Sequence, residues 1–440
     1  MEIERNAYLN ELIERKGNGL VKVVTGLRRC GKSYLLFRLF RRHLLESGVP
    51  PENIVELALD REENRALRNP LRLGETLRAR IASLSGKVYV LLDEIQMVLR
   101  IRNPDIDPAT LAPGEEDAAY IAFHDVLNGL AANPDTDIYV TGSNSRMLAS
   151  DIATSFRGRG DSVCVHPLSF AEYLSAFRGE KAEAWETYLT FGGMPFAATL
   201  PTDRAKRNYL ANLFSEVYFK DIRERLGIRE DYVLDNLVKI LCSGVGSLTN
   251  PHRLVAALQS VQGVKTNDHA VKRLLDALED AFLFRKAQRW DVKGRRYLEY
   301  PAKYYAEDVG LRNAFLNFRQ REPTHLMENV LYNELVRRGL AVDVGVVETV
   351  ETRDGRRAKT LREIDFVVND GPRRTYIQSA WAIPDEEKRL AETLPLRKSG
   401  DFFRKIVVTG NLFEKPWTDE TGIEYIGIIP FLLDEAFLRA

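Results

Sequence analysis

Apolar positions along the N-terminal third of the chain fall into short runs that predict strands separated by helices. Residues 20–25, 54–59 and 88–92 have the length of strands, and the last run is almost continuously apolar, as in a strand buried on both faces. Apolar residues at helical spacing mark residues 33–46 and 123–132. Because strands alternate with helices, we predict an α/β fold built on a parallel, doubly wound sheet.

The pattern becomes mainly helical after residue 169 and changes again further on. Three helical stretches after residue 231 precede two strand-like segments, 284–290 and 297–300, which is the plan of a winged helix. From residue 324 onward, one helix is followed by several short strands. We therefore predict four parts with the boundaries 1–168, 169–230, 231–323 and 324–440.

Composition limits what kind of protein this can be. Lys and Arg number 63, and so do Asp and Glu, so the formal net charge is zero and any basic surface must be local. Cys30, Cys164 and Cys242 are widely spaced, which predicts free thiols in a reducing compartment. The N-terminus lacks the apolar core of a signal peptide, and no apolar run approaches the roughly 20 residues that cross a bilayer. We expect a cytoplasmic protein without membrane contact.

The strongest motif begins directly after the first predicted strand. Residues 26–33 read G-L-R-R-C-G-K-S and fit G-x-x-x-x-G-K-[ST] between a strand and a helix. In such a loop, backbone N–H groups and the helix N-terminus cradle phosphates. Lys32 would bridge the β- and γ-phosphates, and Ser33 would bind Mg²⁺. We predict that ATP, with Mg²⁺, is bound by the loop and the first helical residues: Gly26, Arg28, Arg29, Cys30, Gly31, Lys32, Ser33 and Tyr34.

Acidic and polar residues end the next strands. Asp93 and Glu94 follow the apolar run at 88–92, so Asp93 would hold Mg²⁺ and Glu94 would orient or deprotonate the attacking water. The alternative is a charged strand end that faces solvent. After the strand at 137–141, Asn144 is our candidate for a residue that senses the γ-phosphate. Ser143 is its rival, and a turn without a ligand is the alternative.

Two arginines further along could act on the phosphates of a neighbouring subunit. Arg159, or alternatively Arg157, would stabilise transition-state charge if it reached a γ-phosphate across a subunit boundary. A solvated cluster of charges explains the same residues equally well.

Taken together and in order, these motifs resemble the bacterial and archaeal AAA+-type ATPases that carry a C-terminal DUF4143 domain. The resemblance covers nearly the whole chain and rests on the phosphate loop and on residues 91–96, 141–145, 158–159, 167–173, 188–195, 220–222, 303–313, 328–335 and 362–366.

The resemblance implies an AAA+-like core, a helical lid, a winged helix and a C-terminal α/β domain similar to restriction endonucleases of the PD-(D/E)xK type. It also implies a homo-oligomer. Gly193 and Pro195 are similar to a lid turn whose proline packs near adenine, although Gly-Gly-x-Pro is otherwise simply a turn between helices.

The nuclease-like tail departs from the pattern that cleavage requires. Glu328 or Glu334 could be the first acid and Asp365 the second, but residues 378–380 read Gln-Ser-Ala where Glu-x-Lys is needed. A neutral amide and an alanine make a weak Mg²⁺ site. We therefore expect a retained fold that serves binding or assembly.

DNA is a candidate partner through the winged helix and the C-terminal domain. The hairpin near residues 285–296 is basic, with Trp290 and Tyr297 between the cations, so it could lie along phosphates. A solvated hairpin that contacts protein is the alternative. We predict an ATP-hydrolysing protein whose nucleotide state controls conformation or assembly, with two rivals: a slow-turnover signalling switch and an ATP-powered DNA nuclease.

Overall fold

The structure is a computed structural model that describes residues 3–142, 160–215, 222–223, 231–262, 266–353 and 356–438. The chain divides into two compact units. The N-terminal unit comprises residues 4–166 with 280–282, and the C-terminal unit comprises residues 1–3, 167–279 and 283–440. In the described part of the chain, no helix combines the length and the apolar character that a membrane span needs.

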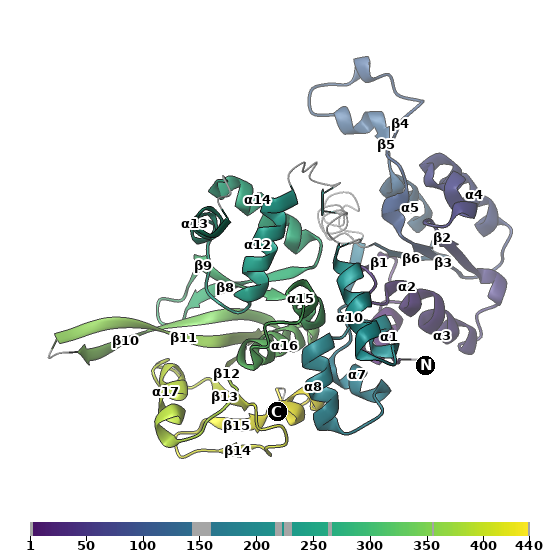
Figure 1. Ribbon diagram of the computed structural model, residues 1–440. Helices are drawn as coiled ribbons and strands as arrows, with labels where there is room; N and C mark the ends of the chain where they lie inside the picture. The colour runs from purple at the N-terminus through teal and green to yellow at the C-terminus, as the bar shows by residue number, and fades with distance from the viewer. Residues whose placement is uncertain are drawn as a thin grey trace. The chain divides into compact units, whose positions relative to one another are not determined.

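A five-stranded parallel sheet forms the centre of the N-terminal unit (Figure 1). Its strand order is β2-β3-β6-β1-β7. Every residue of β1 and of β3 is buried, which agrees with the almost continuous apolar run of β3. The predicted parallel-sheet core of the P-loop type is therefore confirmed. The strands are β1 (Val21–Thr25), β2 (Ile54–Ala58), β3 (Val88–Asp93), β6 (Thr136–Thr141) and β7 (Gly160–Cys164).

Helices cover both faces of this sheet. On one face, α4 and α5 pack an apolar cluster that includes Leu77, Leu92 and Leu127 (Figure 1). Fully burying one such side chain contributes about 1.5–3 kcal/mol. The helix after β1 is continuous but has π-type geometry in its middle. The helical segments are α1 (Asn6–Glu14), α2 (Lys32–Tyr34), η1 (Leu35–Phe40), α3 (Arg41–Glu46), α4 (Pro70–Ala82) and α5 (Phe123–Ala131).

A second, mixed sheet of eight strands organises the C-terminal unit. Its order is β14-β15-β13-β12-β11-β10-β8-β9. The β8–β9 hairpin lies where the sequence predicts it, but β8 also pairs in parallel with β10, so the hairpin extends the sheet of the last region. The strands are β8 (Phe284–Asp291), β9 (Arg296–Ala306), β10 (Ala341–Arg353), β11 (Arg356–Asp370), β12 (Arg373–Ala380), β13 (Arg404–Thr409), β14 (Trp417–Thr418) and β15 (Glu424–Gly427).

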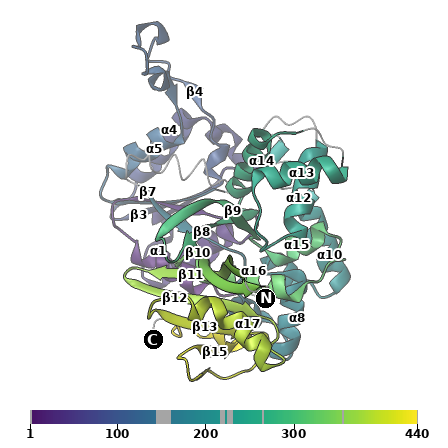
Figure 2. The ribbon, with the colours of Figure 1, turned by 90° about the vertical axis from the view of Figure 1, so that its left-hand side faces the viewer.

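Helices lie before and between the strands of this sheet in the sequence, with one after the last strand, and several of them pack against the sheet. Both views place α12, α13 and α14 together beside β9 (Figures 1 and 2). They precede the hairpin in the order that a winged helix has, although that identification stays a prediction. The helices are α7 (Phe170–Ala176), α8 (Lys181–Phe191), α9 (Pro195–Thr199), α10 (Asp203–Asn212), α12 (Asp231–Ser243), α13 (Pro251–Gln262), α14 (Asp268–Asp280), α15 (Val309–Phe315), α16 (Pro323–Arg337), α17 (Glu386–Arg397) and α18 (Ile428–Leu433).

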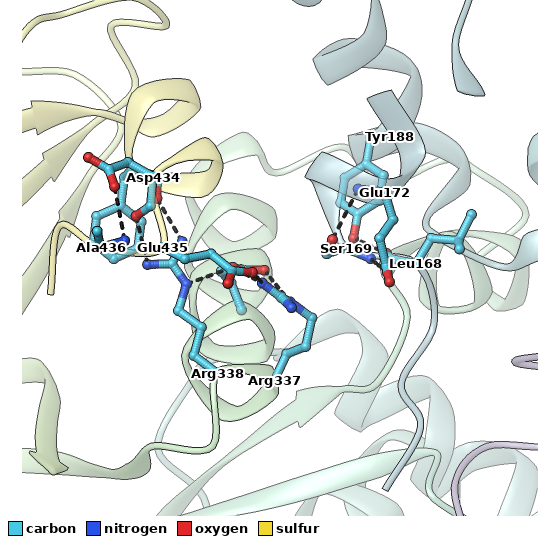
Figure 3. Close-up of polar contacts among 11 residues, drawn as sticks. Leu168, Ser169, Glu172, Tyr188, Arg337, Arg338, Asp434, Glu435 and Ala436 are labelled. Atoms are coloured by element: carbon cyan, nitrogen blue, oxygen red, sulfur yellow. Dashed lines mark hydrogen bonds and ion pairs between the residues drawn. The ribbon is translucent and has the colours of Figure 1, made fainter. Parts of the chain in front are cut away.

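The segment 167–173, part of the family resemblance, starts α7 with a capping box (Figure 3). Ser169 Oγ accepts a hydrogen bond from the Glu172 N–H at 3.1 Å, and the Glu172 carboxylate accepts one from the Ser169 N–H at 2.9 Å. The Tyr188 hydroxyl donates to the Leu168 carbonyl oxygen at 2.8 Å. These bonds satisfy backbone groups at the helix start, so this motif has a structural role.

Candidate nucleotide-binding site

The loop between β1 and α2 turns sharply because three of its residues have positive φ angles. These angles are 129° at Gly26, 64° at Arg29 and 105° at Gly31. Gly26 also has no room for a side chain, because a Cβ there would lie 2.0 Å from the Val165 carbonyl oxygen. Glycine adopts such conformations without steric cost. The backbone itself therefore requires both glycines of the motif.

Lys32 lies inside this loop. Its ammonium donates hydrogen bonds to the carbonyl oxygens of Gly26 at 3.0 Å and Leu27 at 2.9 Å, and only 4% of the residue is exposed. Its partners are neutral oxygens, and it forms no ion pair with any carboxylate in the described part of the chain. A buried ammonium with neutral partners gains from the approach of an anion, so Lys32 is positioned to receive a phosphate.

The two side chains predicted to hold Mg²⁺ lie together at the C-terminal edge of the sheet. Ser33 Oγ donates to Asp93 Oδ1 at 3.0 Å. Thr141, the last residue of β6, donates to the same oxygen, and its hydroxyl accepts the Glu94 N–H at 3.0 Å. Sequence reasoning did not single out Thr141. Its signals in the sequence were its place at a strand end and its position as the first residue of segment 141–145, which is part of the family resemblance.

Glu94 begins the turn that leaves β3, with a φ of 55°. Its carboxylate accepts a hydrogen bond from the Gln96 amide. Burial raises the pKa of the Glu94 carboxyl; the Lys32 charge opposes this rise, and the Asp93 charge adds to it. A carboxylate whose pKa is raised toward neutrality is a better proton acceptor at neutral pH. The environment of Glu94 is therefore suited to the activation of water.

Cys30 contributes to the loop through its backbone. Its buried thiol donates to the Val165 carbonyl oxygen at 3.1 Å, so the side chain faces the protein interior. Arg5 donates to the Cys30 carbonyl oxygen at 2.9 Å and to that of His166 at 2.7 Å. Arg5 thus fixes the loop to the segment that follows β7, and no motif in the sequence marks this link.

The flanking residues predicted to contact nucleotide differ in exposure. Arg28 is half-buried and near enough to Glu94 to lower the pKa of that carboxyl. Arg29 is exposed, and Tyr34 is 40% exposed. Asn144 and Arg159, with their rivals Ser143 and Arg157, lie outside the described residues, and their roles stay predictions.

Gly193 and Pro195 belong to the C-terminal unit. The Gly193 N–H donates to Asp308 Oδ2 at 2.6 Å, and a Cβ on Gly193 would lie 2.2 Å from the Leu168 carbonyl oxygen. Pro195 is the first residue of α9, where its missing N–H costs nothing. These contacts give Gly193 a packing role within its own unit. A contact of Pro195 with adenine stays a prediction.

The donors at the sheet edge fit a magnesium–triphosphate complex. Mg²⁺ takes oxygen ligands and is usually bound through one or two protein groups, with phosphate and water oxygens completing its shell. The exposed Ser33 hydroxyl and the Asp93 carboxylate are such groups. The glycine turn and Lys32 add a cradle and a positive charge. We therefore treat the loop and the ends of β3 and β6 as one candidate nucleotide site.

The acids predicted for a nuclease-like site surround a lysine. The Lys303 ammonium lies 2.7 Å from Glu328 Oε1, 2.5 Å from Glu363 Oε1 and 3.5 Å from Asp365 Oδ1, and all but 3% of Lys303 is buried. Burial raises the pKa of Asp365 to about 8; Glu328 adds to this rise, and Lys303 opposes it. Gln378 Oε1 accepts the Asp365 N–H at 3.4 Å. A search of the described residues found no group of three or more His, Cys, Asp or Glu that could hold a metal ion.

Glu334, the alternative first acid, has partners on its own helix. Its carboxylate lies 2.7 Å from both Arg337 Nη2 and Arg338 Nε, and Figure 3 shows these two arginines beside the chain end near Asp434. Arg337 also pairs with Glu435 at 2.6 Å. Glu334 therefore binds the two arginines that contact the C-terminal segment, and it is not an acid of the Lys303 cluster.

Comparison with known proteins finds two matching domain models and two relatives. Residues 18–174 match the model of an AAA domain, and residues 182–322 match a domain of unknown function, DUF8612. An uncharacterized protein of Haemophilus influenzae is 30% identical over 436 residues, which cover 98% of each chain. An uncharacterized protein of Methanocaldococcus jannaschii is 28% identical over 84% of this chain and 76% of that one.

The comparisons also include a solved structure. The Walker-type ATPase of Pyrococcus abyssi is 16% identical, with a TM-score of 0.48 over 72% of this chain and 96% of the other. A likeness of this degree does not indicate a function.

Proposed function

Because this chain belongs to the same family as the uncharacterized Haemophilus influenzae protein and carries an AAA domain, we propose that it is an ATP-hydrolysing AAA+-type protein whose nucleotide state controls its conformation or assembly. The proposal is carried by one observation: Lys32 lies within the glycine turn, and Ser33 contacts Asp93 at the strand ends. A phosphate cradle and a magnesium site therefore adjoin each other.

Each residue of the site has a separate role in hydrolysis. Lys32 binds the β- and γ-phosphates of ATP, and Ser33 and Asp93 would hold Mg²⁺, which would neutralise phosphate charge. Glu94 accepts a proton from the water that attacks the γ-phosphorus, and ADP leaves with the electrons of the broken P–O bond. Thr141 positions both acids through the hydrogen bonds described above.

The experiment that tests this proposal separates binding from turnover. Glu94→Gln should bind ATP like the wild type and lose hydrolysis by on the order of 10² or more, because an amide cannot accept the proton. Glu52→Gln, an exposed acid on the turn before β2, is the matched control and should keep full activity. Wild-type turnover in Glu94→Gln would move the water-activating role to another residue.

Assembly completes the proposed function. Asn144 would sense the γ-phosphate, Arg159 would reach the nucleotide of a neighbouring copy, and Gly193 with Pro195 would form the lid turn near adenine. Mass photometry with ADP and with a non-hydrolysable ATP analogue tests this part of the proposal. A larger assembly with the analogue supports it, and a monomer in both states contradicts it. Very slow ATP turnover that DNA leaves unchanged would favour the signalling switch.

For the C-terminal region we propose a nuclease-like fold of the DUF4143 type without cleavage. The order α16, β10, β11, β12, α17, β13 supports the fold, since three antiparallel strands lead through a helix to a parallel fourth. The ammonium of Lys303 among the acids argues against cleavage, because it supplies the positive charge that a metal would bring. Plasmid DNA should stay intact with Mg²⁺ or Mn²⁺. Nicking of the plasmid would instead favour the ATP-powered DNA nuclease.

A further inference from the structure

Three loops of the C-terminal unit converge on a pocket of about 740 Å³ that the nucleotide site does not use. The β8–β9 turn contributes Lys293 and Arg295, the β11–β12 turn contributes Arg373 and Arg374, and the segment between α17 and β13 contributes Phe403. These loops are far apart in the sequence, and the shared sheet brings them together because β8, β10, β11, β12 and β13 are successive neighbours.

The pocket has a strong excess of positive charge. Four basic side chains line it, and Asp401 is its only acid among the lining residues. Asp401 already accepts a hydrogen bond from the Tyr376 hydroxyl at 2.6 Å. In the described part of the chain, Lys293, Arg295 and Arg374 form no ion pair with a carboxylate; Lys293 donates to the backbone oxygen of Glu348 instead. The pocket therefore attracts an anion that the protein does not itself supply.

Aromatic rings give the pocket flat walls. The guanidinium of Arg374 contacts two rings, with its carbon 5.4 Å from the centre of Trp290 and 5.3 Å from that of Phe403. Among the residues that the structure describes, the buried Trp290 indole N–H has no hydrogen-bond partner. Next to the pocket, Phe402 is fully exposed, and Phe403 is 40% exposed. Exposed aromatic faces beside cations are surfaces on which nucleic-acid bases can stack.

We propose that this pocket binds a single-stranded segment of nucleic acid, with bases stacked on the Trp290, Arg374 and Phe403 layers and phosphates held by Lys293, Arg295 and Arg373. Stacking platforms inside a basic groove are how proteins hold single strands without reading sequence. A duplex keeps its bases paired and stacked, so they cannot enter a recess between three loops. The inference extends the expectation from the sequence that DNA is a candidate partner, and it does not depend on ATP hydrolysis.

The test measures fluorescence anisotropy of a labelled single-stranded oligonucleotide in the full chain. Phe403→Ala should weaken binding by roughly 5- to 150-fold, which corresponds to about 1–3 kcal/mol for one stacked base. Arg295→Ala should weaken binding and lower the slope of log affinity against log salt by about 1, as expected for a lost phosphate contact. Arg296→Ala is the matched control, since Arg296 lies next in the chain, pairs with Asp291 and does not line the pocket.

Further measurements distinguish a single strand from the other ligands that carry bases and phosphates. The oligonucleotide is measured as DNA and as RNA, against its duplex, and AMP serves as a competitor in the Lys32→Ala variant so that the phosphate loop does not contribute. Tighter binding of the single strand, weakened by Phe403→Ala and Arg295→Ala but not by Arg296→Ala, supports the proposal. Equal affinity for duplex, complete competition by AMP at the affinity of the strand, or unchanged binding in both pocket variants overturns it.

The outcome is distinguishable from failure of the proposed ATPase. ATP turnover is measured on the same preparations, and both pocket variants should retain it because neither residue belongs to the N-terminal unit. An active ATPase without strand binding would overturn the inference alone. Strand binding in a protein that does not hydrolyse ATP would leave the inference standing and remove the proposed function.

Discussion

Thr141 joins the two acids of the nucleotide site, because its one hydroxyl donates to Asp93 and accepts from the Glu94 N–H. Thr141→Val should reduce ATP turnover and lower the free energy of unfolding by about 1–3 kcal/mol, since a buried N–H loses its partner. Thr136→Val is the control on the same strand. Its buried hydroxyl has no hydrogen-bond partner in the part of the chain that the structure describes, so its loss should be neutral or slightly stabilising. Urea unfolding measures the free energy of unfolding of both variants. Equal changes in the two variants would contradict the assigned role of Thr141.

Lys303 neutralises a cluster of buried acids, so its removal should be far more costly than that of an exposed lysine. Lys303→Met leaves Glu328, Glu363 and Asp365 without their cation and should lower the free energy of unfolding by about 3–5 kcal/mol. Lys359→Met removes an exposed pair with Glu348 and should leave the free energy of unfolding almost unchanged. Chemical denaturation measures both. A small decrease in the free energy of unfolding of Lys303→Met would show that the three acids are not ionised at the same time.

Most side chains of the nucleotide site could be predicted from local sequence, because the phosphate loop is a contiguous motif whose glycines serve its own backbone. Ser33 and Asp93 could be paired because parallel strands end at one edge. Thr141, Arg5 and Lys303 could not be predicted. Their roles depend on which residue faces them across the fold, and single threonines, arginines and lysines carry no local signal for that.

At the scale of elements, the capping box at Ser169 gives segment 167–173 a structural role at the start of α7. Ser169→Ala should lower the free energy of unfolding by about 0.5–2 kcal/mol, with ATP turnover unchanged. Ser175→Ala, on the exposed side of the same helix, removes only a bond to the Glu172 carbonyl oxygen and should have little effect. A loss of ATP turnover in folded Ser169→Ala would indicate a functional role for the motif.

The sequence predicted which segments form helices and strands more readily than it predicted which strands pair. Apolar runs located β1, β2, β3 and β6, and helical spacing located α5 and the helix after the phosphate loop. The pairing of β8 with β10 could not be foreseen. Strand periodicity reports which face is buried but not which strand lies alongside, and here the neighbours are separated by the whole of β9, α15 and α16.

At the scale of the whole molecule, the two units place their chemistry separately. The N-terminal unit holds the phosphate loop and its acids, and the C-terminal unit holds the Lys303 cluster and the basic aromatic pocket. If nucleotide state controls assembly or partner binding, a signal must pass between the units. The account therefore depends first on whether the loop binds nucleotide at all.

Isothermal titration calorimetry with ATP, with and without Mg²⁺, tests that claim most directly. The wild type should bind ATP more tightly with Mg²⁺, Ser33→Ala should lose most of this dependence on Mg²⁺, and Lys32→Ala should show no measurable binding, because the ammonium inside the loop is the charge that receives the phosphates. Wild-type affinity for ATP in a folded Lys32→Ala protein would contradict the account.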